Sequence, residues 1–199
     1  MTLIADIQYF SPVIFYIELS CSTNCILDQY EPYRKMSFRN RCVISGANGT
    51  IHLSIPLVEG RTQKRIMKEV RISNSENWQA RHWKTITACY NRSPWFEFYR
   101  DELEGLYLSK ADFLVDWNWS CFNWISSKMA LKTPVALSEQ YHPVYDAPGC
   151  LDWRSHLLPA TINQLYPSLP RYAQVFEDRL GFIPNLSVLD KLFCQGPKG

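Results

Sequence analysis

The chain has 199 residues, of which 46% are hydrophobic, 14% aromatic and 20% charged, and its formal net charge is +2. This composition excludes a disordered chain, and the length suits a single domain over residues 1–199. No apolar run approaches the roughly 20 residues of a membrane-spanning helix, and no secretory leader opens the chain, so the sequence predicts a cytoplasmic protein with no membrane span.

The opening segment predicts a buried strand that runs straight into a helix. Leu3 to Ile7 form an apolar run, and Ser11-Pro12 is typical of an N-cap followed by proline in the first helical position, so we expect a helix from Pro12 to about Cys21. Because ligands gather at the carboxyl ends of strands in open α/β sheets, Gln8 and Tyr9 are candidate substrate-binding residues. The alternative is that Gln8 caps backbone groups and Tyr9 is a core residue.

The next segments add strands. Residues 25–31 predict a second strand and complete a β-α-β unit. Two apolar runs within 41–57 flank the turn sequence SGANGT and predict an antiparallel hairpin. Residues 67–73 predict one further strand.

Three helices then follow in succession. Ser73 and Glu76 have the spacing of a capping box, and helical periodicity continues from there through Tyr90. Residues 93–108 and 113–131 repeat the helical pattern, and residues 133–143 contain a late strand. The end of the chain is predicted as a Pro-rich irregular segment of about 143–170 and a C-terminal docking segment of about 171–196. Together these elements predict a mixed α/β fold, with a central mixed sheet that contains the β-α-β unit and the hairpin and is packed by several helices.

The cysteines and the common motifs exclude several chemistries. The seven cysteines are odd in number and scattered, which favours free thiols in a reducing compartment. Cys21 and Cys25 are closest, but zinc needs four ligands and no second pair has finger-like spacing, so no metal site is expected. The glycine-rich phosphate loops and the HExxH and GxSxG motifs do not occur, and the sequence identifies no cofactor.

Charge is concentrated in one stretch of the chain. Residues 31–71 hold nine Lys/Arg against three Glu, a net of +6, while the remainder has a net of −4. Such a stretch favours an anionic partner, such as a phosphate-bearing sugar or an acyl donor, although it could also be a solvated face. Nucleic acid is not expected, because the net charge is small and no reader motif occurs.

Two parts of the sequence hold candidate site residues. The first lies just before the hairpin and consists of Arg34, Lys35, Arg39, Asn40 and Arg41. Arginine and lysine suit phosphate and carboxylate groups, and an amide can orient an acceptor. The second is His82, the only histidine within a predicted helix. It is the candidate catalytic residue for proton transfer, although a helical histidine can equally be structural.

Several long stretches of the chain together resemble the WbqC-like protein family. They read QYFSPVIFY, YRKMSFRNRCVISGANGTIHLSIPL, NWQARHWKTITACYNRSPWFEFY and QVFEDRLGFIPNLSVLDKLF. One departure is that Tyr9 follows Gln8 where many members have proline. By position, the family's Asn-Arg pair looks like Asn40 and Arg41, its His-Trp pair like His82 and Trp83, and its aromatic-proline region includes Tyr90.

The resemblance implies a bacterial protein of cell-surface polysaccharide (O-antigen type) biosynthesis or sugar modification. We expect a transferase that moves an acyl or aminoacyl group onto an amino sugar or nucleotide sugar. Lys35 and Arg41 would hold a phosphate or carboxylate, Gln8 and Asn40 would orient the acceptor, and Tyr9 and Tyr90 would line the site. The alternative is a non-catalytic protein that binds an anionic small molecule. For all these groups to act together, the tip of the first strand and the basic stretch must border one cavity.

Overall fold

The computed structural model describes residues 1–60 and 62–197. Four parallel strands form one sheet in the order β5-β2-β1-β6, so β1 is an inner strand. Ile4 of β1 lies beside Ile26 of β2 and Asp152 of β6, and the carboxyl ends of these three strands therefore meet at one edge. The strands are β1 (Thr2–Asp6), β2 (Asn24–Asp28), β5 (Val135–Leu137) and β6 (Cys150–Asp152).

A separate antiparallel hairpin joins β3 (Arg41–Gly46) to β4 (Gly49–Ser54). Its two-residue turn, Ala47-Asn48, is followed by Gly49 at a φ of 125°, a backbone conformation that favours glycine. The predicted mixed α/β fold and the hairpin are confirmed. The strands do not form one mixed sheet, however, because the hairpin pairs only with itself and the larger sheet is parallel.

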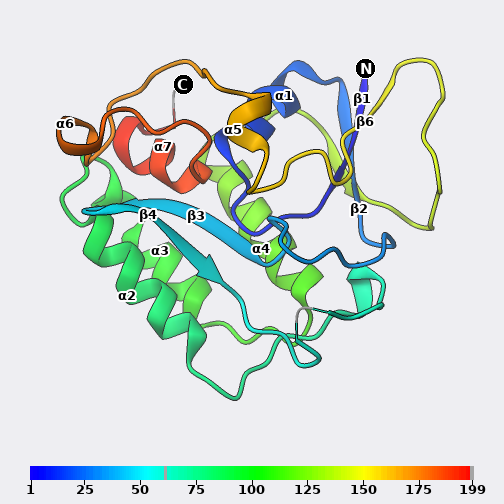
Figure 1. Ribbon diagram of the computed structural model, residues 1–199, viewed down its shortest axis with the longest axis horizontal. Coiled ribbons are helices and arrows are strands. Elements are labelled where there is room, and N and C mark those ends of the chain that lie inside the picture. Colours follow the sequence, from blue (N-terminus) through cyan, green and yellow to red (C-terminus); the bar gives the residue numbers. More distant parts are fainter. Residues whose placement is uncertain (61, 198–199) are drawn as a thin grey trace.

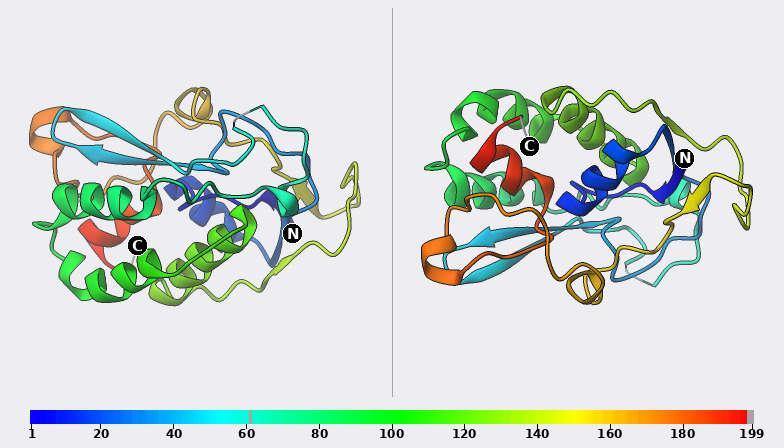
Figure 2. Two further views of the ribbon diagram at one scale, coloured as in Figure 1. Left: turned by 90° about the horizontal axis from the view of Figure 1, so that it is seen from below. Right: turned by 90° about the horizontal axis from the view of Figure 1, so that it is seen from above.

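Helices fill the space between the sheet and the hairpin and cover the hairpin from one side (Figures 1 and 2). The C-terminal helix α7 lies beside the hairpin and packs on α1, α3 and β3. No helix in the described ranges has both the length and the apolar character needed to cross a bilayer. The helices are α1 (Val13–Cys21), the 3-10 helix η1 (Met67–Glu69), α2 (Trp78–Tyr90), α3 (Phe96–Leu108), α4 (Leu114–Lys128), α5 (Ile162–Leu165), α6 (Glu177–Leu180) and α7 (Val188–Gln195).

The boundaries of two predicted helices differ from the structure. Helix α1 has Pro12 as its N-cap residue, because Pro12 forms an isolated bridge with Ser187 at the start of α7. Helix α2 starts after Asn77, whose side-chain oxygen accepts a hydrogen bond from the backbone N–H of Ala80. The predicted capping box that begins at Ser73 is therefore wrong.

The sequence did not predict the short elements η1, β6, α5 and α6. Residues 67–73 form η1 and two single bridges instead of a strand, since Arg71 pairs only with Phe113 and Ile72 only with Leu57. Strand β6 lies inside the segment predicted to be irregular, and its three residues pair with β1. Neither local pattern could indicate this, since both elements depend on segments distant in the sequence.

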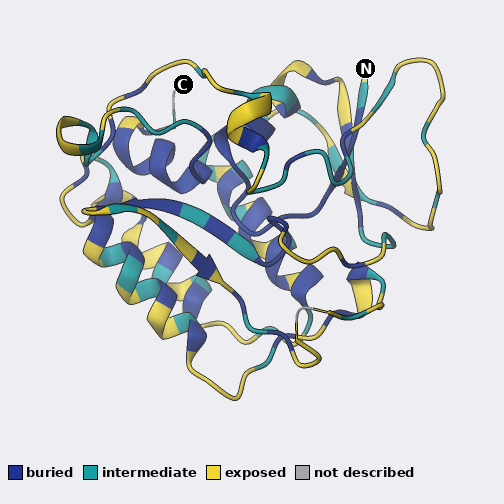
Figure 3. Cartoon of the chain, viewed as in Figure 1, coloured by how far each residue is buried: buried dark blue, intermediate teal, exposed yellow. Residues whose placement is uncertain are grey.

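One continuous core connects the sheet, the hairpin and the helices. Figure 3 shows that α7 is buried on nearly all sides, whereas α2 and α3 each bury one face. The predicted C-terminal docking segment thus contributes a helix to the core. All seven cysteines are free thiols, as predicted.

Candidate functional site

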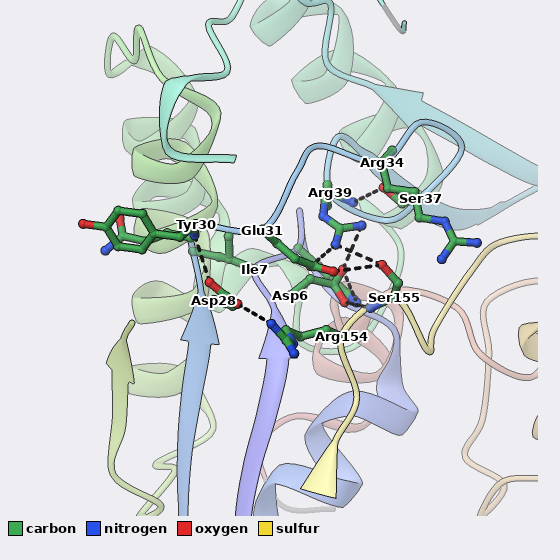
Figure 4. A network of polar contacts seen from close by, with 12 residues as sticks. Asp6, Ile7, Asp28, Tyr30, Glu31, Arg34, Ser37, Arg39, Arg154 and Ser155 are labelled. Carbon is green, nitrogen blue, oxygen red and sulfur yellow. Dashed lines mark hydrogen bonds and ion pairs between the residues drawn. The ribbon is translucent and has the colours of Figure 1, made fainter. Parts of the chain in front are cut away.

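Ionised side chains converge at the carboxyl edge of the parallel sheet (Figure 4). Asp6 ends β1 and Asp28 ends β2, while Glu31 follows β2 by three residues. Arg39 comes from the loop before the hairpin, and Ser155 follows β6 by three residues. The topology therefore brings together side chains from four separate parts of the chain, at the edge where open α/β sheets bind ligands.

Arg39 is the centre of this cluster. Its side chain has no exposed surface, its Nη2 pairs with Glu31, and its Nη1 lies 3.7 Å from Oδ2 of Asp6. Nη2 also donates a hydrogen bond to Oγ of Ser155 at 3.2 Å. A buried guanidinium is costly without counter-ions, so the two carboxylates balance its charge.

The loop that carries Arg39 is fastened to the end of β1. The backbone N–H of Tyr9 donates to the carbonyl of Phe38 at 2.9 Å. From α4, Nδ2 of Asn118 donates to the carbonyl of Arg39 at 2.7 Å and to that of Ile7 at 3.3 Å. These bonds hold the basic loop against the tip of the first strand.

Ser155 is held in place by Asp6. Its backbone N–H donates to Oδ1 of Asp6 at 2.9 Å, and its φ of 56° lies in the left-handed region that residues other than glycine rarely adopt. Its Oγ lies 3.3 Å from Oε1 of Glu31. The preceding residue, Arg154, pairs with Asp28 at 3.0 Å and with Asp152 at 2.7 Å, which fixes the turn from its other side.

A cavity of about 440 Å³ lies over Glu31 and Ser155. This volume falls within the range of about 300–1,000 Å³ that is typical of small-molecule sites. The cavity is also lined by two exposed cationic side chains, Arg34 and Lys35. Burial raises the pKa of Glu31 above its ordinary value, and the neighbouring Arg39 opposes this only in part. The cavity therefore combines a carboxyl group of raised pKa with two exposed cationic side chains.

Of the predicted site residues, Lys35 lines this cavity and Gln8 lies beside the cluster. Gln8 is buried, and its Nε2 donates to Oδ2 of Asp6 at 3.2 Å. Asn40 and Arg41 line a neighbouring cavity of about 220 Å³, which shares Tyr33 with the first. The Asn40 amide is already engaged, since it accepts from the Tyr33 hydroxyl and donates to the carbonyl of Ile55.

Tyr9 and His82 lie together in the core. The Tyr9 hydroxyl is 3.0 Å from Nδ1 of His82 and also bonds the Tyr107 hydroxyl. Burial is the main cause that lowers the pKa of His82 to about 4, so the ring is neutral at pH 7. None of the cavities described here is lined by His82.

Tyr90 lies elsewhere in the core, where its hydroxyl donates to Asp190 at 2.7 Å and accepts from the backbone N–H of Ser45. The predicted residues thus divide among the carboxyl edge, the neighbouring cavity and two core positions. The cluster adds residues that the sequence did not single out, namely Asp6, Glu31 and Ser155. The one available signal was that Asp6 is the next-to-last residue of the first predicted strand and Glu31 is the last residue of the second, near the ends where site residues concentrate.

The comparisons with known proteins give one match. The model of the WbqC-like protein family matches residues 8–153, which include Gln8, Glu31, Lys35 and Arg39 and end two residues before Ser155. No curated protein and no solved structure matches the chain.

Proposed function

The chain belongs to the WbqC-like protein family, and from this premise we propose that it transfers an acyl or aminoacyl group to an amino sugar or nucleotide sugar in cell-surface polysaccharide biosynthesis. The observation that carries the proposal is the cavity at the carboxyl edge of the sheet, where Glu31 lies between a buried cation and two exposed ones. Family membership supports the proposed biological context, and the charged lining of the cavity supports the proposed chemistry.

Arg34 and Lys35 would bind the phosphate or carboxylate of the substrate. Both are exposed at the cavity and come from the stretch of the chain with a net charge of +6. Guanidinium and ammonium groups form charge-assisted hydrogen bonds with such anions, each worth about 1.5–3 kcal/mol. Arg41 is less suited to the same anion, because it lines the neighbouring cavity.

Glu31 would accept the proton that the acceptor amine loses as it is acylated. A general base works best when its pKa approaches the working pH, and burial shifts Glu31 in that direction. Glu31 lines the cavity, whereas His82 is buried beside Tyr9 with a lowered pKa. We therefore assign the proton-transfer role to Glu31 in place of His82.

The test uses the purified chain, a panel of nucleotide amino sugars and acyl or aminoacyl thioesters. Binding is measured by calorimetry, and product by mass spectrometry. We expect the double change Arg34→Ala and Lys35→Ala to weaken nucleotide-sugar binding more than tenfold, which corresponds to at least about 1.4 kcal/mol. The control Lys64→Ala removes an exposed cation of the same basic stretch that lines none of the cavities described, and should bind as the wild type does.

Glu31→Gln separates catalysis from binding. We expect it to retain binding within a few-fold and to lose turnover by 100-fold or more, in keeping with a general base. A sugar that binds but is recovered unchanged with every donor would instead favour the non-catalytic alternative. Equal turnover in Glu31→Gln and wild type would refute the assigned role.

A further inference from the structure

Ser155 has contacts that a structural serine does not need. Buried or turn serines commonly bond nearby backbone groups. The hydroxyl of Ser155 instead contacts two charged side chains, since it donates to Oε1 of Glu31 at 3.3 Å and accepts from Nη2 of Arg39 at 3.2 Å. Ser155 also lines the 440 Å³ cavity and is partly exposed.

These two contacts are those of an activated nucleophile. The proton of Ser155 is directed at a carboxylate whose pKa is raised by burial, and such a carboxylate is a better base than an ordinary one. The oxygen lies next to a fully buried cation, which stabilises negative charge as it develops on Oγ. Figure 4 shows Glu31 and Ser155 pointing toward each other, with Arg39 beside both.

The backbone supports the same interpretation. Ser155 has a φ of 56°, a conformation that glycine would adopt without strain. The N–H of Ser155 is held by Asp6, which Arg39 in turn neutralises. The hydroxyl is thus presented at the end of a parallel strand, in a turn where glycine would be the easier choice.

We propose that Ser155 is a covalent nucleophile that accepts the acyl group from an acyl thioester and passes it to the amino sugar. This inference rests on the proposed function, and it adds a covalent intermediate to the reaction. Ser155, Glu31 and Arg39 are the catalytic residues, because Glu31 and Arg39 both contact the reacting oxygen of Ser155.

The transfer has two balanced steps. In the first, a bond forms between Oγ of Ser155 and the carbonyl carbon, Glu31 takes the hydroxyl proton, and the carbon–sulfur bond breaks. The leaving thiolate then takes that proton from Glu31 and departs as a thiol. In the second step, the amine attacks the serine ester, its proton passes to Glu31 and on to Oγ, and the amide product leaves with Ser155 restored.

The experiment measures acylation without any sugar. The protein is incubated with an acyl thioester, or with a fluorophosphonate that phosphonylates activated serines, and the intact mass and the modified peptide are determined. We expect one adduct per chain, located on Ser155. Ser155→Gly should abolish the adduct and still fold, because glycine suits a φ of 56°. Ser155→Cys should retain acylation and add labelling by thiol reagents at that position.

Ser138→Ala is the matched control. Ser138 follows β5 at the same edge of the sheet and donates to Oδ1 of Asp28, but it lines none of the cavities described. Its replacement should leave the adduct unchanged. No adduct on Ser155, or an equal adduct in Ser155→Gly, would overturn the inference.

The failures of this inference and of the proposed function are distinguishable. If nucleotide sugars bind and are acylated while Ser155 stays unmodified and Ser155→Gly remains active, the transfer is direct and only the nucleophile is wrong. If Ser155 is acylated but no sugar binds, the nucleophile is confirmed and the proposed acceptor is wrong. Glu31→Gln should slow the adduct at least tenfold, and a rate equal to wild type would remove Glu31 from the first step.

Discussion

Asp190 anchors the C-terminal helix in the core, and its ionisation should contribute to the pH dependence of stability. The residue lies in α7 and has no exposed surface, and Oδ2 accepts a hydrogen bond from the Tyr90 hydroxyl at 2.7 Å. Burial is the dominant cause that raises its pKa from the ordinary 3.8 to about 6, with the hydrogen bond from Tyr90 opposing it. The folded protein therefore holds this proton more tightly than the unfolded chain does.

The sign and magnitude follow from proton linkage. Between pH 3.8 and about 6, Asp190 binds more protons in the folded state than in the unfolded state, so its contribution to the free energy of unfolding falls as the pH rises through this window. The difference between the two pKa values corresponds to about 3 kcal/mol, which is lost above pH 6. The Asp190→Asn variant has no ionisable group at this position, so it should keep this stability above pH 6. Its amide oxygen can still accept the hydrogen bond from the Tyr90 hydroxyl.

The assay is urea unfolding of both proteins at pH 4, 5, 6, 7 and 8. The free energy of unfolding of Asp190→Asn minus that of wild type should rise by about 2–3 kcal/mol from pH 4 to pH 7 and then level off. Asp101→Asn, which changes an exposed carboxyl group on α3, controls for the removal of one negative charge. A difference for Asp190→Asn that does not vary with pH would refute the reasoning.

Three further substitutions test the framework of the site, each by urea unfolding. Arg39→Met should destabilise the fold by about 3–5 kcal/mol, because Asp6 would remain buried without its counter-ion, and a loss below about 1 kcal/mol would contradict this. Asn118→Ala should cost about 1–3 kcal/mol, since it frees the carbonyls that join Arg39 to the first strand, and an unchanged midpoint would argue against that role. Tyr9→Phe should cost about 1–2 kcal/mol by leaving His82 without its hydroxyl partner, and a variant as stable as wild type would show that this bond adds nothing.

Local sequence patterns identified most of the regular elements. The apolar run at the start, the two-residue turn of the hairpin and the helical periodicity of residues 78–128 each act within one segment, and each element formed close to its predicted place. The errors occurred where a segment depends on distant partners. Strand β6 exists because Thr2, Leu3 and Ile4 of β1 pair with it. Residues on both sides of η1 form single bridges to distant segments, Ile66 to Pro32 and Arg71 to Phe113.

The candidate site shows the same division. The sequence pointed to the tip of the first strand and to the basic stretch before the hairpin, and these do lie together, since Arg39 pairs with Asp6. It could not show that Glu31 would be drawn to Arg39, or that a turn after β6 would place Ser155 between them. It also could not decide that His82 would face Tyr9 in the core.

By itself, the sequence determined helices α1 to α4, the hairpin, the inner strand and the location of the positive charge, because periodicity and turn chemistry act between near neighbours. Only the tertiary structure decided which charges would meet and which would be buried. The residue type alone gives a side chain's charge, but its counter-ion and its burial depend on residues far along the chain. Those two quantities set the pKa of Glu31 and the environment of Ser155, and with them the chemistry that the cavity can perform.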